Sequence, residues 1–234
     1  FEQKISYFEN FGVDFLINKS FNKKFSKITS HNFIENILCK RLKLKYIFVS
    51  NNFRFGYKRE GNVKQLKNYQ EKYKFKLINP KPLKKKNKII SSTLIRKLLQ
   101  RGNLNIANKI LKRHWSIEGI VEKGRMMGKK IGFPTCNIDI KNYIIAKIGV
   151  YAVKVKINNR GKAYKGIANL GYRPTFNQKK ILLEVNLFNF SGNLYNKKLS
   201  VEFLKFIRGE KKFNGVDDLK NQIKRDLVIA KNVK

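Results

Sequence analysis

The sequence is poor in the residues that build disulfide frameworks and metal clusters. Its 234 residues include two cysteines, two histidines and 15 acidic side chains. Cys39 and Cys136 lie far apart, in segments that have the pattern of ordinary folded structure. We therefore expect no disulfide framework, and a reducing, cytoplasmic location. His31 and His114 are too few, and the two thiols too scattered, for a His-rich metal site.

Long apolar runs are also lacking. No stretch approaches the roughly 18–20 apolar residues that span a bilayer. The aromatic and charged start of the sequence does not have the pattern of a secretory signal peptide. We expect no membrane segment. The first residue is Phe1 and not Met, so we expect a fragment or a processed form of a longer protein.

Acidic residues are outnumbered by basic ones, 15 against 53, and the formal net charge is +38. Such a charge by itself indicates nucleic acid or an anionic surface as a partner. The basic residues are, however, spread along the whole chain and accompany abundant Asn and Ile. A general bias of composition explains them better than a dedicated binding face. We expect no specific nucleic-acid partner, although the charge favours any ligand that carries phosphate.

The first half of the chain alternates helix and strand signals. Helical spacing of apolar residues after Ser30 predicts a helix that this serine caps. Tyr73, Phe75 and Leu77 alternate with lysines and predict a strand. The remaining predicted elements are a strand at 45–50 and helices at 91–102 and 103–113. Helices that alternate with apolar strands predict an open α/β sheet.

After His114 the pattern changes to strands. Residues 150–157 alternate apolar and polar side chains, and similar patterns occupy 115–124, 163–171, 181–190 and 198–207. Several strands at regular spacing predict a small barrel or a sandwich. A last helix is predicted from about Val216, with Leu219, Ile223 and Leu227 on one stripe. We place the domain boundary between residues 113 and 114, giving domains 1–113 and 114–234.

The stretch GRMMGKKIGFPTCNI (124–138) has the parts of a nucleotide site. Glycines let the backbone approach phosphates closely, and Lys129 adds positive charge. Thr135 and Asn137 offer hard oxygens that suit Mg²⁺, while Pro134 fixes the backbone before them. The alternative is a glycine-rich hairpin whose Thr and Asn satisfy turn hydrogen bonds. The loop is not a Walker A motif, because G-x-x-x-x-G-K-[ST] does not occur in the sequence.

Glu184 is an isolated carboxylate in the strand pattern ILLEVNLF. A carboxylate beside a bound hydroxyl group can act as a general base. The alternative is a solvent-facing residue that shares a strand face with Asn186.

The segment ISSTLIR (90–96) is a candidate anion site. Ser92 and Thr93 offer hydroxyl groups at a helix start, and Arg96 follows within the first turns. The alternative is a plain helix cap.

Several motifs resemble known families in order and spacing. GRMMGKKIGFPTCNI, GVYAVKV, GIANLGYRPTF and LLEVNLFNFSGNLYNKKLSVEFLKFIRGEKKF resemble the riboflavin kinase module. FVSNNFRFGYKREGNV and ISSTLIRKLLQRGNLNIANKILKRHWSIEG resemble the adenylyltransferase module. Nearly the whole chain thus resembles the prokaryotic bifunctional riboflavin kinase/FMN adenylyltransferases, or FAD synthetases. The resemblance implies an incomplete Rossmann-like α/β nucleotidyltransferase domain, followed by a six-stranded antiparallel β-barrel kinase domain with a C-terminal helix.

The resemblance also implies substrates and roles for individual residues. The substrates would be riboflavin, FMN and ATP, with Mg²⁺ as the metal. In the kinase domain Glu184 would activate the riboflavin 5′-hydroxyl, and Thr135 and Asn137 would hold Mg²⁺. The implied ATP-binding residues are Gly124, Lys129, Gly132, Pro134 and Thr135 in the kinase domain and Ser92, Thr93 and Arg96 in the adenylyltransferase domain. The implied flavin-binding residues are Asn52, Arg208 and Glu210.

The sequence departs from the family in one respect that bears on activity. The adenylyltransferase domain of the family opens with a His-x-Gly-His motif that binds ATP, and this sequence contains no such motif. We expect the chain to phosphorylate riboflavin but not to adenylylate FMN, which a full-length parent would do. A sheet without its first strand would expose an edge, so we also expect weak self-association. The alternatives are a flavin-binding protein without turnover and a nucleic-acid-binding protein.

Overall fold

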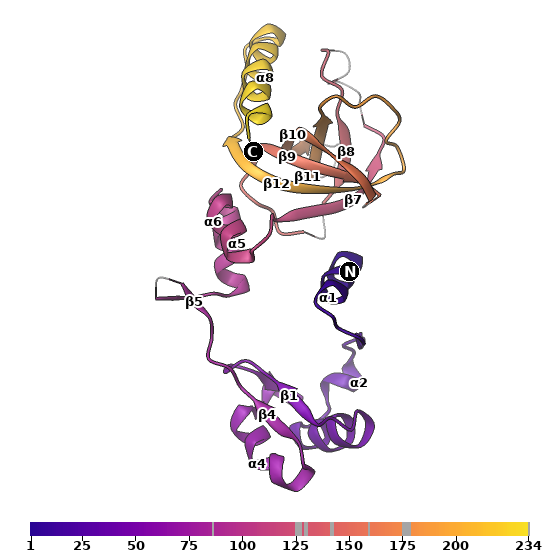
Figure 1. Cartoon of the computed structure of the whole chain (residues 1–234), viewed down its shortest axis with the longest axis vertical. Helices are drawn as coiled ribbons and strands as arrows, with labels where there is room; N and C mark the ends of the chain where they lie inside the picture. The colour runs from indigo at the N-terminus through magenta and orange to yellow at the C-terminus, as the bar shows by residue number, and fades with distance from the viewer. Residues whose placement is uncertain are drawn as a thin grey trace. The chain divides into compact units, whose positions relative to one another are not determined.

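Two separate hydrophobic clusters organise the chain. The computed structural model describes residues 1–85, 87–124, 128, 131–140, 143–158, 160–174 and 179–233. The chain divides into two compact units, residues 1–90 and 91–234, each with one of the clusters. Figure 1 shows both units.

The first unit is a small α/β arrangement around a two-stranded parallel sheet. Strand β1 (Tyr46–Phe48) pairs with β4 (Lys76–Ile78), and Ile47 lies opposite Leu77. Parallel strands need a long crossover connection, and here that connection contains helix α4 (Val63–Tyr73). The cluster of this unit consists of Ile34, Leu38, Val49, Phe55, Leu66 and Phe75.

The remaining elements of the first unit are short. Its other helices are α1 (Glu2–Asn10), α2 (Lys23–Ser26), α3 (Ser30–Asn32), the π-helix η1 (Phe33–Arg41) and the 3-10 helix η2 (Tyr57–Arg59). Two hairpins pair β2 (Arg54–Phe55) with β3 (Gly61–Asn62) and β5 (Lys84–Lys85) with β6 (Lys88–Ile89).

The structure corrects two local predictions in this unit. Tyr73 ends α4 and does not begin a strand, because Lys74 adopts the left-handed conformation (φ 52°) and stops the helix there. The helix begins with Asn62, whose side chain accepts a hydrogen bond from the Gln65 backbone N–H at 3.0 Å. The helix cap expected at Ser30 is one residue earlier, at Thr29, whose hydroxyl accepts from the Asn32 N–H at 3.2 Å.

The second unit contains the predicted six-stranded antiparallel barrel. Its strand order is β10-β11-β8-β7-β12-β9, and each neighbouring pair is antiparallel, so the alternative of an open sandwich is excluded. The strands are β7 (Ser116–Glu122), β8 (Cys136–Asp139), β9 (Gly149–Ile157), β10 (Arg160–Pro174), β11 (Lys179–Leu187) and β12 (Lys198–Arg208).

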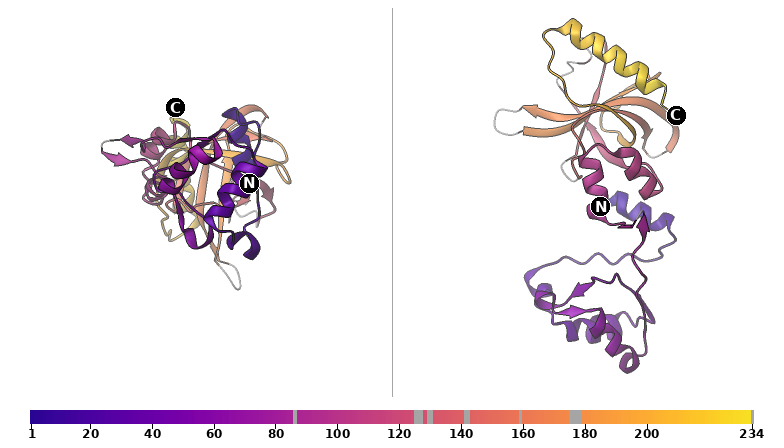
Figure 2. Two further views of the ribbon diagram at one scale, coloured as in Figure 1. Left: turned by 90° about the horizontal axis from the view of Figure 1, so that it is seen from below. Right: turned by 90° about the vertical axis from the view of Figure 1, so that its left-hand side faces the viewer.

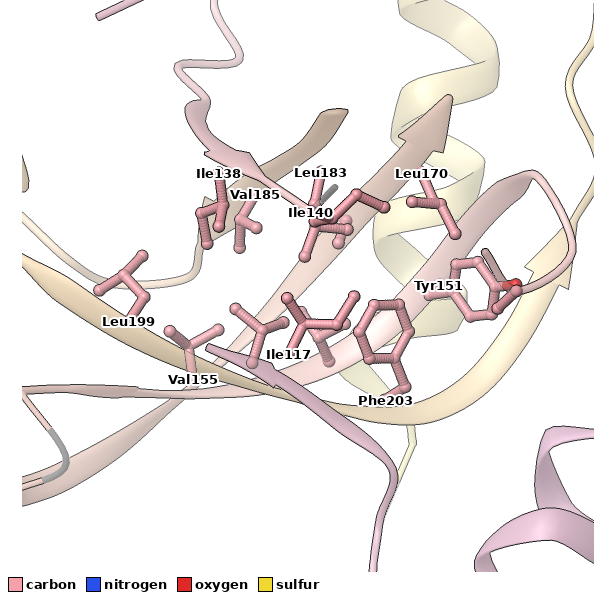
Figure 3. Packing of buried hydrophobic residues seen from close by; sticks show 14 of the residues in the cluster. Ile117, Ile138, Ile140, Tyr151, Val155, Leu170, Leu183, Val185, Leu199 and Phe203 are labelled. Carbon is pink, nitrogen blue, oxygen red and sulfur yellow. The ribbon is translucent and has the colours of Figure 1, made fainter. Parts of the chain in front are cut away.

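Alternate residues of these strands fill the barrel (Figure 3). Tyr151 and Phe203 pack edge to face inside it, with ring centroids 5.0 Å apart. Because successive side chains of a strand point to opposite faces, the residues between the core positions must point outward. The labelled core residues are Ile117, Ile138, Ile140, Tyr151, Val155, Leu170, Leu183, Val185, Leu199 and Phe203.

Helices α5 (Ser92–Gln100) and α6 (Leu104–Leu111) pack onto the barrel. Leu99, Leu104 and Ala107 belong to the barrel's hydrophobic cluster. The Asn108 side chain of α6 links this helix to the barrel, because it accepts a hydrogen bond from the Trp115 N–H at 2.8 Å and donates one to the Phe203 carbonyl of β12 at 2.9 Å. The compact units therefore divide at residue 90. The domain boundary predicted from the sequence between residues 113 and 114 follows the order of the motifs and not the packing. It stays a prediction.

The C-terminal helix α8 (Val216–Lys231) runs along the outside of the barrel and contacts β9, β10 and β12 (Figure 2). Its C-terminal end is held by Lys165, whose Nζ donates to the carbonyl oxygens of Lys231 (3.3 Å) and Val233 (2.9 Å). Among the described helices, α8 included, none combines the length and apolar character needed to cross a bilayer.

Candidate functional site

The outer face of the barrel carries a cavity of about 790 Å³ beneath α8. One wall comes from the segment between β7 and β8, a second from the outward faces of the barrel strands, and a third from α8 and the residues before it. The lining of the cavity includes Phe133, Thr135, Asn137, Asn169, Glu184, Asn186, Arg208, Glu210, Phe213, Leu219, Ile223, Asp226 and Leu227.

Strand register places the polar lining residues in one row across the barrel. Asn137 of β8 lies opposite Glu184 of β11, and Glu184 lies opposite Asn169 of β10. Asn169 in turn lies opposite Val150 of β9, which faces Arg208 of β12. Directly opposed residues project from the same face of a sheet. The register alone therefore brings an amide, a carboxylate and a second amide side by side.

Asn137 is a buried amide whose side-chain oxygen lacks a hydrogen bond within the described part of the chain. Its side chain is 6% exposed, and its Oδ1 atom has no hydrogen-bond partner among the described residues. The amide Nδ2 lies directly against Gly124, where a Cβ would collide with it. A buried acceptor without a partner costs about 1–3 kcal/mol. A ligand that supplies a donor or a cation to this oxygen would recover that cost.

Thr135 follows a turn that side-chain and backbone hydrogen bonds fix in place. The Asn186 Nδ2 donates to the Pro134 carbonyl at 2.6 Å, and the Phe133 N–H donates to the Gly128 carbonyl at 2.8 Å. A Cβ on Gly128 would collide with the Phe133 carbonyl, so glycine is required there. The turn holds Thr135 at the edge of the cavity, two residues before Asn137 in the chain.

Oxygen ligands near Thr135 and Asn137 fit a hard divalent cation. Mg²⁺ binds oxygen and is usually held by few protein ligands together with substrate phosphates. The orphaned Oδ1 of Asn137 and the hydroxyl of Thr135 are ligands of that kind. Among the described residues no three His, Cys, Asp or Glu side chains gather into a metal cluster. The oxygen donors of Thr135 and Asn137 suit Mg²⁺ bound together with a phosphate ligand.

The wall opposite the polar row is apolar. Helix α8 contributes Leu219, Ile223 and Leu227, the stripe that the sequence predicted, and Phe213 lies just before the helix. The three α8 residues are half-buried, which is the state of apolar side chains that still border an open space. A flat aromatic ligand between this wall and the barrel would remove their surface from water.

Arg208 lines the cavity but is bound to a buried carboxylate. Its Nη2 lies 2.7 Å from Asp226 Oδ2, and its Nε lies 2.9 and 3.1 Å from the two Asp226 oxygens. Its Nη1 donates to the Gly209 carbonyl at 2.9 Å. The flavin contact expected for Arg208 stays a prediction, with the added fact that most of its donors are already engaged.

Glu210 reaches the same cavity from the segment after β12. Its Oε1 lies over Gly171 of β10, where a Cβ would come within 2.5 Å. The predicted residues Thr135, Asn137, Glu184, Arg208 and Glu210 thus border one cavity. Their roles remain predictions.

Other predicted residues lie elsewhere. Gly132 has a positive φ of 89°, which favours glycine, and Lys129 lies outside the described residues. Ser92, Thr93 and Arg96 are exposed in the first turns of α5, where Ser91 is the cap that accepts from the Leu94 N–H. Asn52 belongs to the other compact unit and accepts from the Ser50 hydroxyl at 2.9 Å.

A second cavity of about 360 Å³ adjoins the first at Thr135. Thr135 and Asn186 border both cavities. The loop between β11 and β12 contributes Phe190, Leu194 and Tyr195 to the lining of the second cavity. The two spaces are therefore neighbours that share the turn carrying Thr135.

Sequence reasoning missed Asn169, Asn186 and Asp226. Asn169 had a signal, because in GIANLG it alternates with the core residues Ala168 and Leu170 and so faces outward. Asn186 was noted only as a neighbour of Glu184 on its strand face. Asp226 lies three and seven residues after Ile223 and Leu219, on the apolar side of the helix, but this spacing does not reveal its partner Arg208.

Comparisons with known families agree with this architecture. The family model described as riboflavin kinase matches residues 111–234. The family model described as FAD synthetase matches residues 1–94.

Similar curated proteins carry both descriptions in one name. A bifunctional riboflavin kinase/FMN adenylyltransferase of Buchnera aphidicola subsp. Schizaphis graminum is 42% identical over 98% of this chain and 74% of its own length. The protein of that name from Escherichia coli K12 is 35% identical over 98% of this chain and 73% of its own length.

A solved structure has a similar fold and a different name. The crystal structure described as a macrolide-efflux protein from Streptococcus pneumoniae is 29% identical, with a TM-score of 0.87 over 100% of this chain and 75% of that chain. Its name disagrees with those of the curated relatives. The assignment of this chain rests on the two family models and the relatives, while that structure supports the fold.

Proposed function

Because this chain belongs to the family of bifunctional riboflavin kinase/FMN adenylyltransferases of FAD biosynthesis, we propose that the outer face of its barrel is the riboflavin kinase active site. The observation that carries this proposal is the row in which Asn137 lies directly opposite Glu184, with a buried Oδ1 that has no hydrogen-bond partner in the described part of the chain. A phosphate-linked cation site next to a carboxylate is what phosphoryl transfer to a hydroxyl group requires.

Thr135 and Asn137 hold the metal end of the nucleotide. The oxygens of both side chains would hold Mg²⁺, which would supply positive charge to offset the negative charge of the ATP phosphates. The glycines at 124 and 132 allow the backbone to come close to the phosphates, and Pro134 sets the direction of the turn. Lys129 adds positive charge to the same loop.

Glu184 acts on the other reactant. Its carboxylate accepts the hydrogen bond of the riboflavin 5′-hydroxyl and takes the proton as the oxygen attacks the γ-phosphorus of ATP. The bond between the γ-phosphorus and the β,γ-bridging oxygen breaks in line, leaving ADP and FMN. Asn169, opposite Glu184 on β10, is placed to orient the ribityl chain.

The two cavities suit the two substrates. The larger one offers an apolar α8 wall and Phe213 to the flavin ring, with Arg208 and Glu210 at its polar end. The smaller one offers Phe190, Leu194 and Tyr195 to the adenine base. Thr135 borders both cavities, which is where the γ-phosphoryl group would pass from ATP to riboflavin.

The adenylyltransferase half has a narrower role in this chain. Ser92, Thr93 and Arg96 bind ATP phosphates and Asn52 binds flavin in that reaction, as the resemblance of their motifs implies. The 234-residue sequence contains no His-x-Gly-His motif. Without the motif that binds ATP in the family, this sequence would not convert FMN to FAD.

Weak self-association is also part of the proposal. Tyr46 and Phe48 of β1 are 61% and 69% exposed, and an exposed edge strand favours pairing with another chain. Sedimentation over a range of concentrations tests this point. A monomer at all concentrations would contradict it.

Incubation with riboflavin, ATP and Mg²⁺, followed by separation of the flavins, tests the kinase function. FMN is the expected product. Riboflavin binding without FMN, from a folded sample, would indicate a flavin-binding protein without turnover. Tight, salt-dependent DNA or RNA binding without flavin binding would indicate the nucleic-acid alternative.

A further inference from the structure

Among the described residues, side-chain hydrogen bonds and ion pairs join helix α8 to the barrel at two places, which are called its fastenings. Near its middle, Asp226 pairs with Arg208 at the end of β12. Near its C-terminal end, Lys165 of β10 donates to the carbonyls of Lys231 and Val233. Only the first of these fastenings borders the large cavity.

The Asp226 carboxylate is buried and has hydrogen bonds to both oxygens. Arg208 approaches it in the two-pronged manner that fixes direction as well as distance. Gln222, one turn earlier on α8, donates to Asp226 Oδ1 at 2.9 Å. The desolvation cost of a buried ion pair offsets much of its attraction, so the pair is weak evidence for a role in stability. What the pair provides is a fixed distance and direction between Arg208 and Asp226.

Each end of this pair leads to a different wall of the cavity. Asp226 shares a helix face with Ile223 and Leu219, which precede it by three and seven residues, and both border the cavity. Arg208 lies in the same strand-register row as Asn169 and Glu184. The pair therefore spans the distance between the apolar wall and the polar row.

We propose that Asp226 is a positioning residue for the flavin substrate, which through Arg208 holds the apolar face of α8 at a fixed distance from the row that contains Glu184. This inference rests on the proposed kinase function. The flavin ring occupies the space whose width the pair sets, whereas the adenine base of the nucleotide occupies the second cavity. Loss of the pair should thus weaken flavin binding selectively.

The test compares Asp226→Asn with Lys165→Met in the full chain. Both changes remove one fastening of α8, but Lys165 is exposed and does not border the cavity. The measurements are the riboflavin dissociation constant from flavin fluorescence, the KM values for riboflavin and ATP, kcat, and the melting temperature.

Asp226→Asn is expected to raise the riboflavin Kd and KM by about tenfold or more, while the KM for ATP stays within about twofold. Lys165→Met is expected to leave both KM values within about twofold. Asp226→Glu, which keeps the charge, should recover part of the riboflavin affinity. These three results together distinguish positioning from general loosening of the helix.

Three outcomes would overturn the inference. The first is an equal effect of Asp226→Asn and Lys165→Met on riboflavin binding. The second is a parallel loss of riboflavin and ATP affinity with a lower melting temperature, which would mark a structural role. The third is riboflavin affinity of Asp226→Asn equal to wild type. If Asp226→Asn does not fold, Arg208→Lys replaces it, and unchanged riboflavin affinity there would count against the inference.

Failure of the proposed function gives a different result. In that case wild type itself makes no FMN and binds no riboflavin, and the inference falls with it. Wild type that makes FMN, together with an Asp226→Asn variant that behaves like it, would overturn only the positioning role.

Discussion

Asn137 and Glu184 lie directly opposite each other on β8 and β11, and both side chains point out of the barrel into one cavity. The residues on either side of each belong to the barrel core. The pair is therefore placed by strand register and by core packing, which are the most rigid features of this unit. A shift of register by one residue would turn both side chains into the core.

Replacing Asn137 with Leu tests its proposed role as a metal ligand. Because its Oδ1 has no partner among the described residues, an apolar residue of similar size should not lower the free energy of unfolding of the unliganded protein. Affinity for ATP in the presence of Mg²⁺ should fall by about tenfold or more. Denaturant unfolding and calorimetric titration measure the two effects.

The control for this change is Asn186→Leu. Asn186 borders the same cavity, but its amide donates to the Pro134 carbonyl at 2.6 Å. Loss of that bond should destabilise the protein by about 0.5–1.5 kcal/mol. Wild-type affinity for ATP and Mg²⁺ in Asn137→Leu would remove Asn137 from the metal site.

Replacing Gly149 with Ala tests the junction between β9 and β12. Gly149 has a φ of 145°, and a Cβ there would collide with the backbone carbonyl of Arg208. We expect a loss of stability of about 1–3 kcal/mol or more, measured by urea unfolding. Gly209→Ala is the control, because a Cβ there meets nothing within 4 Å. Equal stability of the two variants would contradict this reading of the junction.

Cys136 should be unreactive in the folded protein. Burial raises the pKa of its thiol to about 11, and only the thiolate attacks alkylating reagents. At pH 8 we expect iodoacetamide to label Cys136 slowly in native protein and rapidly in urea. Mass spectrometry measures the label, with half-buried Cys39 as the internal comparison. Rapid labelling of Cys136 in native protein would contradict its place in the core.

The same pKa predicts a direction for stability at high pH. The folded state holds the Cys136 proton more tightly than the unfolded chain, whose thiol has the ordinary pKa near 9.0. The contribution is fully present below about pH 9 and is lost as pH rises through about 11. The stability of wild type relative to Cys136→Ala should fall over that interval. A constant difference would contradict the shift.

The adenylyltransferase reaction should be absent from this chain. Supplied with FMN, ATP and Mg²⁺, it should form no FAD, because the sequence contains no His-x-Gly-His motif. Arg96→Ala should leave the rate of FMN formation within about twofold, since Arg96 is exposed and borders neither cavity. Chromatography of the flavins decides both points, and measurable FAD would overturn the first.

The strands of the second unit, and the outward direction of their polar residues, could be predicted from the sequence because alternation is a strong local signal. Glu184 and Asn137 each lie between two apolar residues, and this pattern places them on the outer face. The closure of the strands into a barrel, and the pairing of Glu184 with Asn137, depend on contacts between distant segments. No pattern within one strand specifies them.

The wrong and incomplete predictions also have physical causes. Tyr73 alternates with Phe75 and Leu77, but it also follows Tyr69 by four residues and Leu66 by seven, which is helical spacing. The helix that Asn62 caps extends to Tyr73. The α8 stripe was identified, but its function as a cavity wall was not, because periodicity cannot distinguish core contact from a ligand wall. The partner of Arg208 is a residue 18 positions later, and only the fold brings Asp226 to it.

The most direct test of the kinase site is the rate of FMN formation by Glu184→Gln, with ATP affinity measured in parallel. We predict a fall in kcat of roughly 10²–10⁴, the usual contribution of a general base, and little change in ATP affinity. Glu202→Gln, a strand carboxylate outside the cavity and 3.5 Å from His114, should keep wild-type turnover. Unchanged turnover in Glu184→Gln would contradict the account.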